Sequence, residues 1–215
     1  MRKTANLITK IDIDDVRVPT SDSLLGSDPF HRKPDYSVAT VRITTDSGKI
    51  GWSVVFGIGA GTDWLVYGLC DLSGLLVGLD MNDFAEDPGK VHRRLMDHHQ
   101  LRWLGDGVYR MGVGGLVNAL WDLWAKLEDK PLWALLSELP VETILASIDW
   151  RYLRDVLAPE DARAILERGR QDAGERRAEM LQRGPLAYST SGWLGLSDAE
   201  VLANIQDLQR LGFRH

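Results

Sequence analysis

The chain has 215 residues and 44% hydrophobic content, enough for one large domain or two modest ones with a buried core. Its 31 acidic and 25 basic residues give a formal net charge of −6. This charge argues against general binding to nucleic acid or to anionic membranes, because both depend on an excess of Lys and Arg. The single cysteine, Cys70, excludes an internal disulfide, and its apolar surroundings predict a buried structural thiol in a reducing compartment.

The sequence shows no signal for export or for membrane insertion. The N-terminus carries basic residues without an apolar run behind them, so we expect no secretory signal. The longest apolar stretch, residues 64–79, contains Asp71 and is shorter than the ~20 residues that a transmembrane helix needs. We therefore expect a cytoplasmic protein with no membrane or nucleic-acid partner.

The first sixty residues predict an antiparallel sheet. Apolar and polar residues alternate over 7–13, which is typical of a half-buried strand. Residues 19–34 are rich in Ser, Asp, Gly and Pro and are interpreted as a loop. Two β-rich runs then flank residues 46–48, whose composition, Asp-Ser-Gly, is that of a hairpin turn. Three consecutive strands of this kind form a meander rather than a parallel sheet.

The hydrophobic period becomes helical after this sheet. Thr62 is expected to cap the first helix, and the broadest apolar stripe belongs to residues 113–127, where apolar residues recur at spacings of three and four. The expected helices run over 62–78, from 83 or 88 to 103, over 113–127, and from 131 onward for a short distance.

The second half predicts alternating strands and helices. The apolar run "ILASID", residues 144–149, is interpreted as a strand, and a long helix is expected over 159–183. Ser197 followed by Glu200 forms a capping box, and this helix ends at Gly212. The order of elements indicates a parallel barrel or a wound sheet.

A glycine cluster suggests a nucleotide site and a group of histidines suggests a metal site, but their spacing supports neither function. Gly57, Gly59 and Gly61 resemble a dinucleotide-binding turn, but Thr62 replaces the third glycine of that motif and the preceding strand belongs to an antiparallel meander. A tight loop is the better interpretation. The histidines 92, 98 and 99 lack the i, i+4 spacing of a metal-chelating pair. The residues alone therefore contain no catalytic constellation.

Several stretches together resemble the enolase superfamily and, within it, the L-fuconate dehydratase family of sugar-acid dehydratases. They are "DVRVPTS" with "GSD" after it, "PDYSVA", "GLVNALWDLWAKLEDKPLWALL", "SIDWRYLRDVLAPEDA" and "AYSTSGWLGLSD". The resemblance implies an α+β N-terminal capping domain over residues 1–140, made of a three-stranded antiparallel meander plus helices. It implies that residues 141–215 form the first units of an incomplete (β/α) barrel.

The resemblance also implies where a substrate binds. Residues 19–34 and 57–61 correspond to the loops with which the cap closes over the mouth of the barrel. The positions that match substrate-contacting residues are Gly26, Ser27, Asp28 and Tyr36. Two departures leave the substrate open: Ala60 stands where relatives usually carry a basic residue, and His31, Arg32 and Lys33 make the first loop more basic than usual.

The implied reaction is that of a hydro-lyase. It removes the proton α to a carboxylate and expels the β-hydroxyl as water, giving a 2-keto-3-deoxy sugar acid, with Mg²⁺ stabilising the enediolate. The resemblance places the base and the metal-binding acids on later barrel strands, so we assign no catalytic or metal residue here and expect the chain alone to be inactive.

The implied partners are a sugar acid and either further copies of the chain or a complementary C-terminal half. Without such a protein partner, we expect Ile144, Leu145, Ile148 and Leu202 to be uncovered. Two alternatives remain open: a non-catalytic, cap-like binding module, and another reaction of the superfamily, such as racemisation or cycloisomerisation.

Overall fold

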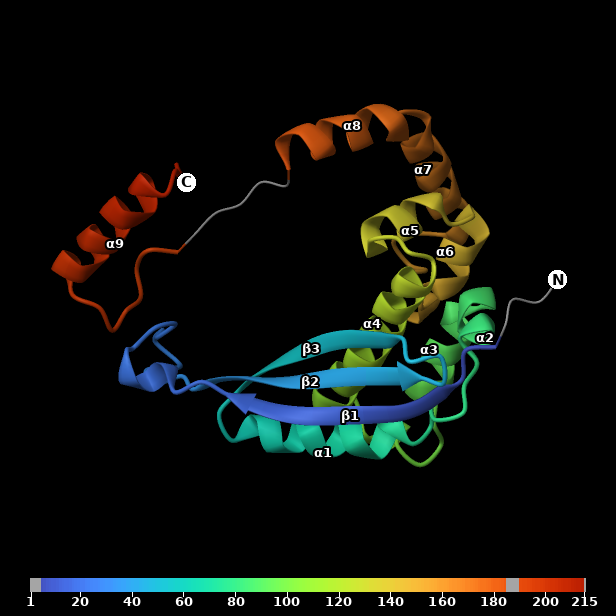
Figure 1. The fold of residues 1–215 in the computed structure, drawn as a ribbon, viewed down its shortest axis with the longest axis horizontal. Helices are drawn as coiled ribbons and strands as arrows, with labels where there is room; N and C mark the ends of the chain where they lie inside the picture. Colours follow the sequence, from blue (N-terminus) through green and yellow to red (C-terminus); the bar gives the residue numbers. More distant parts are fainter. Residues whose placement is uncertain (1–4, 185–189, 215) are drawn as a thin grey trace.

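The computed structural model describes residues 5–184 and 190–214, and its N-terminal part is a three-stranded antiparallel sheet in the order β1-β2-β3 (Figure 1). The strands are β1 (Ile8–Arg17), β2 (Tyr36–Thr45) and β3 (Ile50–Ile58). Arg17 of β1 lies opposite Ser37 of β2, and Tyr36 of β2 lies opposite Ile58 of β3. The predicted meander is thereby confirmed.

Helices follow the sheet through the rest of the described chain. The α-helices are α1 (Gly61–Ser73), α2 (Met81–Glu86), α3 (Pro88–Met96), α4 (Val108–Leu127), α5 (Leu132–Glu138), α6 (Val141–Ser147), α7 (Pro159–Gln171), α8 (Ala173–Arg183) and α9 (Asp198–Arg210). Short 3₁₀ turns are η1 (Thr20–Asp22), η2 (Arg102–Leu104) and η3 (Trp150–Tyr152). Figure 1 shows α7 and α8 arching away from the sheet, whereas α9 lies apart from both, beyond the end of the sheet where β1 leads into η1.

The core lies between one face of the sheet and the helices α1 and α4. Alternate residues of β2 point into this core. The apolar face of α4, whose residues recur with the helical period of 3.6, points into it from the opposite side. Its fully buried side chains include Val41, Ile43, Leu69, Leu72, Leu116, Leu120 and Leu123. Packing of this apolar face, rather than helix propensity, holds the cap together.

Glycine lets α4 approach β3 closely. A Cβ added to Gly115 would lie 2.5 Å from Cγ2 of Val55, so no side chain fits there. The Ser53 hydroxyl donates to the Gly115 carbonyl at 2.6 Å, and the Trp52 amide donates to Oδ2 of Asp122 at 2.7 Å. Both bonds join β3, the last strand of the sheet, to α4, and the second satisfies a main-chain amide on its open edge.

The N-terminal helices differ from the predicted ones in how they begin. Residue Ala60, not Thr62, occupies the N-cap of α1, and the buried Thr62 hydroxyl has no hydrogen-bond partner among the described atoms. Of the two expected starts for the next helix, Pro88 is correct, because Asp87 caps α3 by accepting a bond from the Lys90 amide at 2.9 Å. The expected end at Trp103 is wrong, since α3 ends at Met96 and Trp103 lies in η2. Cys70 is exposed on α1, so the prediction of a buried thiol is wrong.

The predicted strand at residues 144–149 is also wrong. The run lies mostly in α6, and only its last two residues, Ile148 and Asp149, are extended. Leu145 is buried against α7, and Ile144 packs against the main core, so these two are covered within the chain. A short apolar run does not distinguish a strand from a buried helix, and here contacts with α3 and α7 favour the helix.

The C-terminal helices bury little. The expected long helix breaks at Asp172 into α7 and α8, and neither α8 nor α9 has a buried residue. Leu202 is 59% exposed, as expected for a face without a partner. The capping box of α9 is confirmed, since the Ser197 amide donates to Oε2 of Glu200 at 2.8 Å. The barrel units assigned to residues 141–215 stay a prediction, because the described part shows no strand there.

No helix in the described part of the chain combines the length and apolar character needed to cross a membrane.

Candidate functional site

Two loops meet at the end of the sheet where β2 begins. We call residues 18–35 the first loop and residues 57–61 the second loop. Asp35 holds both: its Oδ1 accepts bonds from the Ser21 amide at 3.2 Å and the Ser21 hydroxyl at 2.5 Å. Its main-chain oxygen accepts a bond from the Gly59 amide at 2.8 Å. The Ser21 bonds hold the pKa of the Asp35 carboxyl below its usual value, so the group stays ionised at neutral pH.

Gly26 and Tyr36, two of the predicted site residues, are in direct contact. The Tyr36 hydroxyl donates to the Gly26 carbonyl at 3.0 Å, and its ring packs edge-on against Phe56 with the centroids 5.2 Å apart. Gly26 has φ of +77°, and a Cβ there would overlap the Tyr36 ring and hydroxyl. Only glycine fits this position without strain.

Asp28 forms a compact turn and keeps its side chain near solvent. Its Oδ1 accepts bonds from the amides of Phe30 at 2.7 Å and His31 at 2.6 Å, and its Oδ2 lies 3.1 Å from Nδ1 of His31. The bonds from His31, and then that from Phe30, lower the pKa of the Asp28 carboxyl. The side chain remains 47% exposed. An ionised, half-exposed carboxylate is an acceptor suited to the hydroxyl groups of a polyol.

Ser27 is buried and faces a distant part of the chain. Its hydroxyl oxygen accepts a bond from the Gly195 amide at 2.8 Å, and its carbonyl accepts one from the Leu194 amide at 3.2 Å. Figure 1 shows the segment before α9 descending to the first loop. The structure thus brings the four predicted site residues together, although contact of any of them with a substrate stays a prediction.

The charges around these loops are unevenly placed. Arg32 and Lys33 are exposed on the first loop, whereas Ala60 leaves the second loop without a basic side chain. Arg17, at the end of β1, is paired with Asp15 at 2.8 Å and also with Asp63 of α1. The positive charge available to an anionic ligand therefore lies on the first loop.

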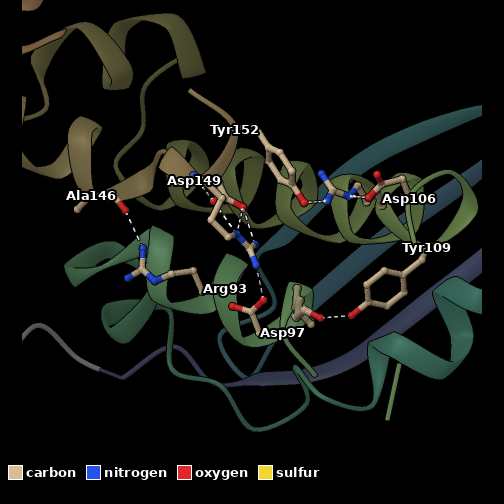
Figure 2. Close-up of polar contacts among 10 residues, drawn as sticks. Arg93, Asp97, Asp106, Tyr109, Ala146, Asp149 and Tyr152 are labelled. Carbon is tan, nitrogen blue, oxygen red and sulfur yellow. Dashed lines mark hydrogen bonds and ion pairs between the residues drawn. The ribbon is translucent and has the colours of Figure 1, made fainter. Parts of the chain in front are cut away.

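A second polar cluster joins α3 to the end of α6 and the segment after it (Figure 2). Arg151 donates to Oδ2 of Asp149 at 2.6 Å and to Oδ1 of Asp97 at 2.6 Å. Arg93 donates to the Ala146 carbonyl at 3.1 Å, and a Cβ on Gly89 would overlap that same carbonyl. Hydrogen bonds from Arg151 lower the pKa of Asp149 to about 2, so the pair remains charged.

The same cluster extends onto α4. The Arg110 guanidinium donates to the Tyr152 hydroxyl at 2.8 Å, lies 4.9 Å from the centroid of that ring, and pairs with Asp106. The Tyr109 hydroxyl bonds to the Leu95 carbonyl. Figure 2 shows Tyr152 and Asp106 on either side of the guanidinium that they share, whereas Tyr109 points away from them, toward the Leu95 carbonyl. Because the charged groups are paired, the cluster serves to fasten residues 146–152 to the cap.

The three histidines noted in the sequence do not assemble a metal site. Burial lowers the pKa of His92, and His98 stacks on His99 with ring centroids 5.1 Å apart. Over residues 5–184 and 190–214, no three His, Cys, Asp or Glu side chains are placed to hold a metal ion.

Sequence reasoning missed Ser21, Asp35, Asp97 and Arg151 as structural anchors of these two regions. The pair Asp149 and Arg151, two residues apart, was a visible signal, since side chains at that spacing can pair across a turn. The partner of Arg151 in the cap, Asp97, lies 54 residues earlier and had no such signal.

Comparison with known proteins relates the chain to one group. No family model matches it. Mitochondrial enolase superfamily member 1 of Xenopus laevis is 39% identical over 211 residues, which cover 96% of this chain and 47% of the relative. L-galactonate dehydratase of Hypocrea jecorina is 37% identical over 212 residues, which cover 97% of this chain and 47% of the relative.

A solved structure agrees with this relationship. The crystal structure of human mitochondrial enolase superfamily member 1 superposes with a TM-score of 0.93 at 38% identity, covering 97% of this chain and 48% of that one. The chain spans about half the length of the curated relatives that it matches.

Proposed function

We propose that this chain, whose sequence resembles enolase superfamily relatives and whose fold matches their N-terminal cap, forms the capping part of a sugar-acid dehydratase. The observation that carries the proposal is the 37% identity to L-galactonate dehydratase along 97% of the chain. The reaction removes the proton α to the carboxylate and expels the β-hydroxyl as water. The resulting enol tautomerises to a 2-keto-3-deoxy acid.

The first loop supplies most of the substrate contacts in this proposal. The half-exposed Asp28 carboxylate accepts hydrogen bonds from sugar hydroxyls, and Arg32 and Lys33 attract the substrate's carboxylate by charge. L-fuconate and L-galactonate are the two candidate substrates, the first from the family resemblance and the second from the relative's activity. Ala60 leaves the second loop uncharged, so the positive charge that attracts either carboxylate comes from the first loop.

The proposal assigns no metal ligand to this chain. Mg²⁺ supplies electrostatic stabilisation of an enediolate when it is bound, but the described residues do not fit such a site, since no three ligating side chains gather. The role of the chain is to bind, orient and cover the substrate.

A chimera tests the proposal. This chain replaces the matched 47% of L-galactonate dehydratase, and purified protein is assayed for 2-keto-3-deoxy acid with L-fuconate, L-galactonate and other sugar acids. We expect dehydration of at least one acid and a lower rate with Asp28→Ala. The 215-residue chain assayed alone is expected to form no keto acid. A folded chimera that dehydrates no sugar acid of the panel would refute the proposal.

The second candidate function is a non-catalytic module that binds an acid sugar. The ionised Asp28 carboxylate and the exposed Arg32 and Lys33 favour it, because binding an acid sugar requires only contacts of this kind. In this case the chain binds a sugar acid in its loops while the folded chimera remains inactive. Racemisation or cycloisomerisation would instead give an isomer without keto acid in the same assay.

A further inference from the structure

We infer that Ser27 is a positioning residue whose bonds to residues 194 and 195 clasp the first loop onto the segment that precedes α9. The Ser27 hydroxyl oxygen accepts from the Gly195 amide at 2.8 Å, and the Ser27 carbonyl accepts from the Leu194 amide at 3.2 Å. Ser27 is only 5% exposed, so its hydroxyl faces this segment rather than solvent. Two adjacent amides are thereby held by one residue that lies far away in the sequence, 168 positions before Gly195.

The opposite side of the contact fits equally closely. A Cβ on Gly195 would lie 2.6 Å from Cβ of Leu24 and 2.8 Å from the Ser27 hydroxyl oxygen. Glycine is therefore required at residue 195 for the segment to reach the loop. Gly192, in the same segment, has more room, because the nearest atom to an added Cβ is Cγ1 of Val201 at 3.3 Å.

The clasp acts on a strained part of the loop. Leu24 has φ of +56° and Gly26 has φ of +77°, both in the left-handed region, which is unfavourable for leucine. Tyr36 holds the Gly26 carbonyl from β2, and the segment before α9 holds Ser27. Asp28 follows directly after these two held residues, so its position is set from both sides. That Asp28 meets a sugar acid rests on the proposed function, whereas the clasp itself does not.

Residue-resolved hydrogen exchange on the full chain tests the clasp. In Ser27→Ala, exchange of the Gly195 amide should rise by about fivefold or more, the ratio expected when one hydrogen bond is lost. Exchange of the Leu194 amide should rise less, because its acceptor is the Ser27 main-chain carbonyl, which the variant keeps. Gly195→Ala should raise exchange over residues 22–28 to a similar extent. The double variant should add little to either single change, because both break the same contact.

Two further variants separate positioning from general destabilisation. Ser27→Thr keeps a hydroxyl oxygen at the same place and should restore slow exchange at residues 194 and 195. Gly192→Ala is the matched glycine control: its added Cβ meets only Val201 of α9, so exchange over residues 22–28 should stay unchanged. Wild-type exchange at residues 194 and 195 in Ser27→Ala, or an equal rise across the α4 core, would overturn the inference.

The clasp and the proposed function fail in different ways. In the chimera, Ser27→Ala is expected to raise KM by about fivefold or more with a smaller change in kcat, since Asp28 is displaced but the reaction centre is not. If exchange behaves as expected while no sugar acid reacts, the proposed function fails and the clasp stands. If a sugar acid reacts but exchange in Ser27→Ala matches the wild type, the clasp is wrong.

Discussion

The Asp35 carboxylate accepts two hydrogen bonds from Ser21, one from its amide and one from its hydroxyl. The main-chain oxygen of Asp35 accepts a third bond from Gly59. One residue at the start of β2 thus fastens both loops of the candidate site, the first through its side chain and the second through its backbone. The two attachments can be separated by mutation.

Asp35→Ala should loosen the first loop and leave the second in place. The side-chain bonds to Ser21 are lost, whereas the backbone bond to Gly59 remains. Hydrogen exchange should become faster at residues 20–22 and stay unchanged at Gly59. Ser21→Ala is the matched control, and it should reproduce a weaker form of the effect because the amide bond persists. Equal loosening of both loops would contradict this assignment.

Two neighbouring glycines of α4 should respond oppositely to alanine. Gly115→Ala places a Cβ 2.5 Å from Val55, and overpacking of this kind costs about 1–3 kcal/mol. Gly114→Ala, with no atom within 4 Å of the added Cβ, should stabilise the helix by up to about 1 kcal/mol. Urea denaturation monitored by circular dichroism measures both free energies of unfolding. Similar values for the two variants would mean that α4 does not approach β3 as described.

The Asp149–Arg151 pair should make stability depend on acid pH. Asp149 has a pKa of about 2 in the folded chain against 3.8 for the ordinary group, so the folded state binds its proton less readily than the unfolded state. Its contribution, of the order of 2 kcal/mol, is fully present above about pH 4 and is lost as the pH falls toward 2.

The Asp149→Asn variant isolates this contribution. Its free energy of unfolding should be lower than that of the wild type by about 1–2 kcal/mol at pH 7, and the difference should shrink below pH 4. Asp155→Asn, which removes an exposed carboxylate from the same segment, is the control. A difference that stays constant between pH 7 and pH 3 would show that the charge of Asp149 does not stabilise the fold.

Elements that depend on interactions between neighbouring residues were predicted correctly, whereas an element that depends on contacts between distant residues was not. The meander was predictable because alternation over residues 7–13 and the turn at 46–48 are local signals. The capping box of Ser197 and Glu200 was equally local. The run at 144–149 was misread because its helix depends on contacts with α3 and α7, which no local pattern contains.

The same distinction between local signals and long-range contacts applies to the candidate site. Resemblance placed Gly26, Ser27, Asp28 and Tyr36 in one region, and the structure brings them together. It gave no indication that the Ser27 hydroxyl faces Gly195, because that contact joins residues 168 positions apart. Physical reasoning from sequence therefore located the loops, whereas the anchors that fix them required coordinates.

The contact between Tyr36 and Gly26 gives the last prediction. Tyr36→Phe removes the bond to the Gly26 carbonyl but keeps the ring against Phe56, so it should lower the free energy of unfolding by about 0.5–1.5 kcal/mol. Gly26→Ala should cost more, because it adds left-handed backbone strain of about 1 kcal/mol to an overlap with the Tyr36 ring. Denaturation by urea measures both variants, with Gly48→Ala as control. Gly48 also has a positive φ, +78°, but no atom lies within 4 Å of an added Cβ, so this variant reports the backbone strain alone. If Gly26→Ala is no more destabilising than Gly48→Ala, the Tyr36 ring does not fill the space beside Gly26.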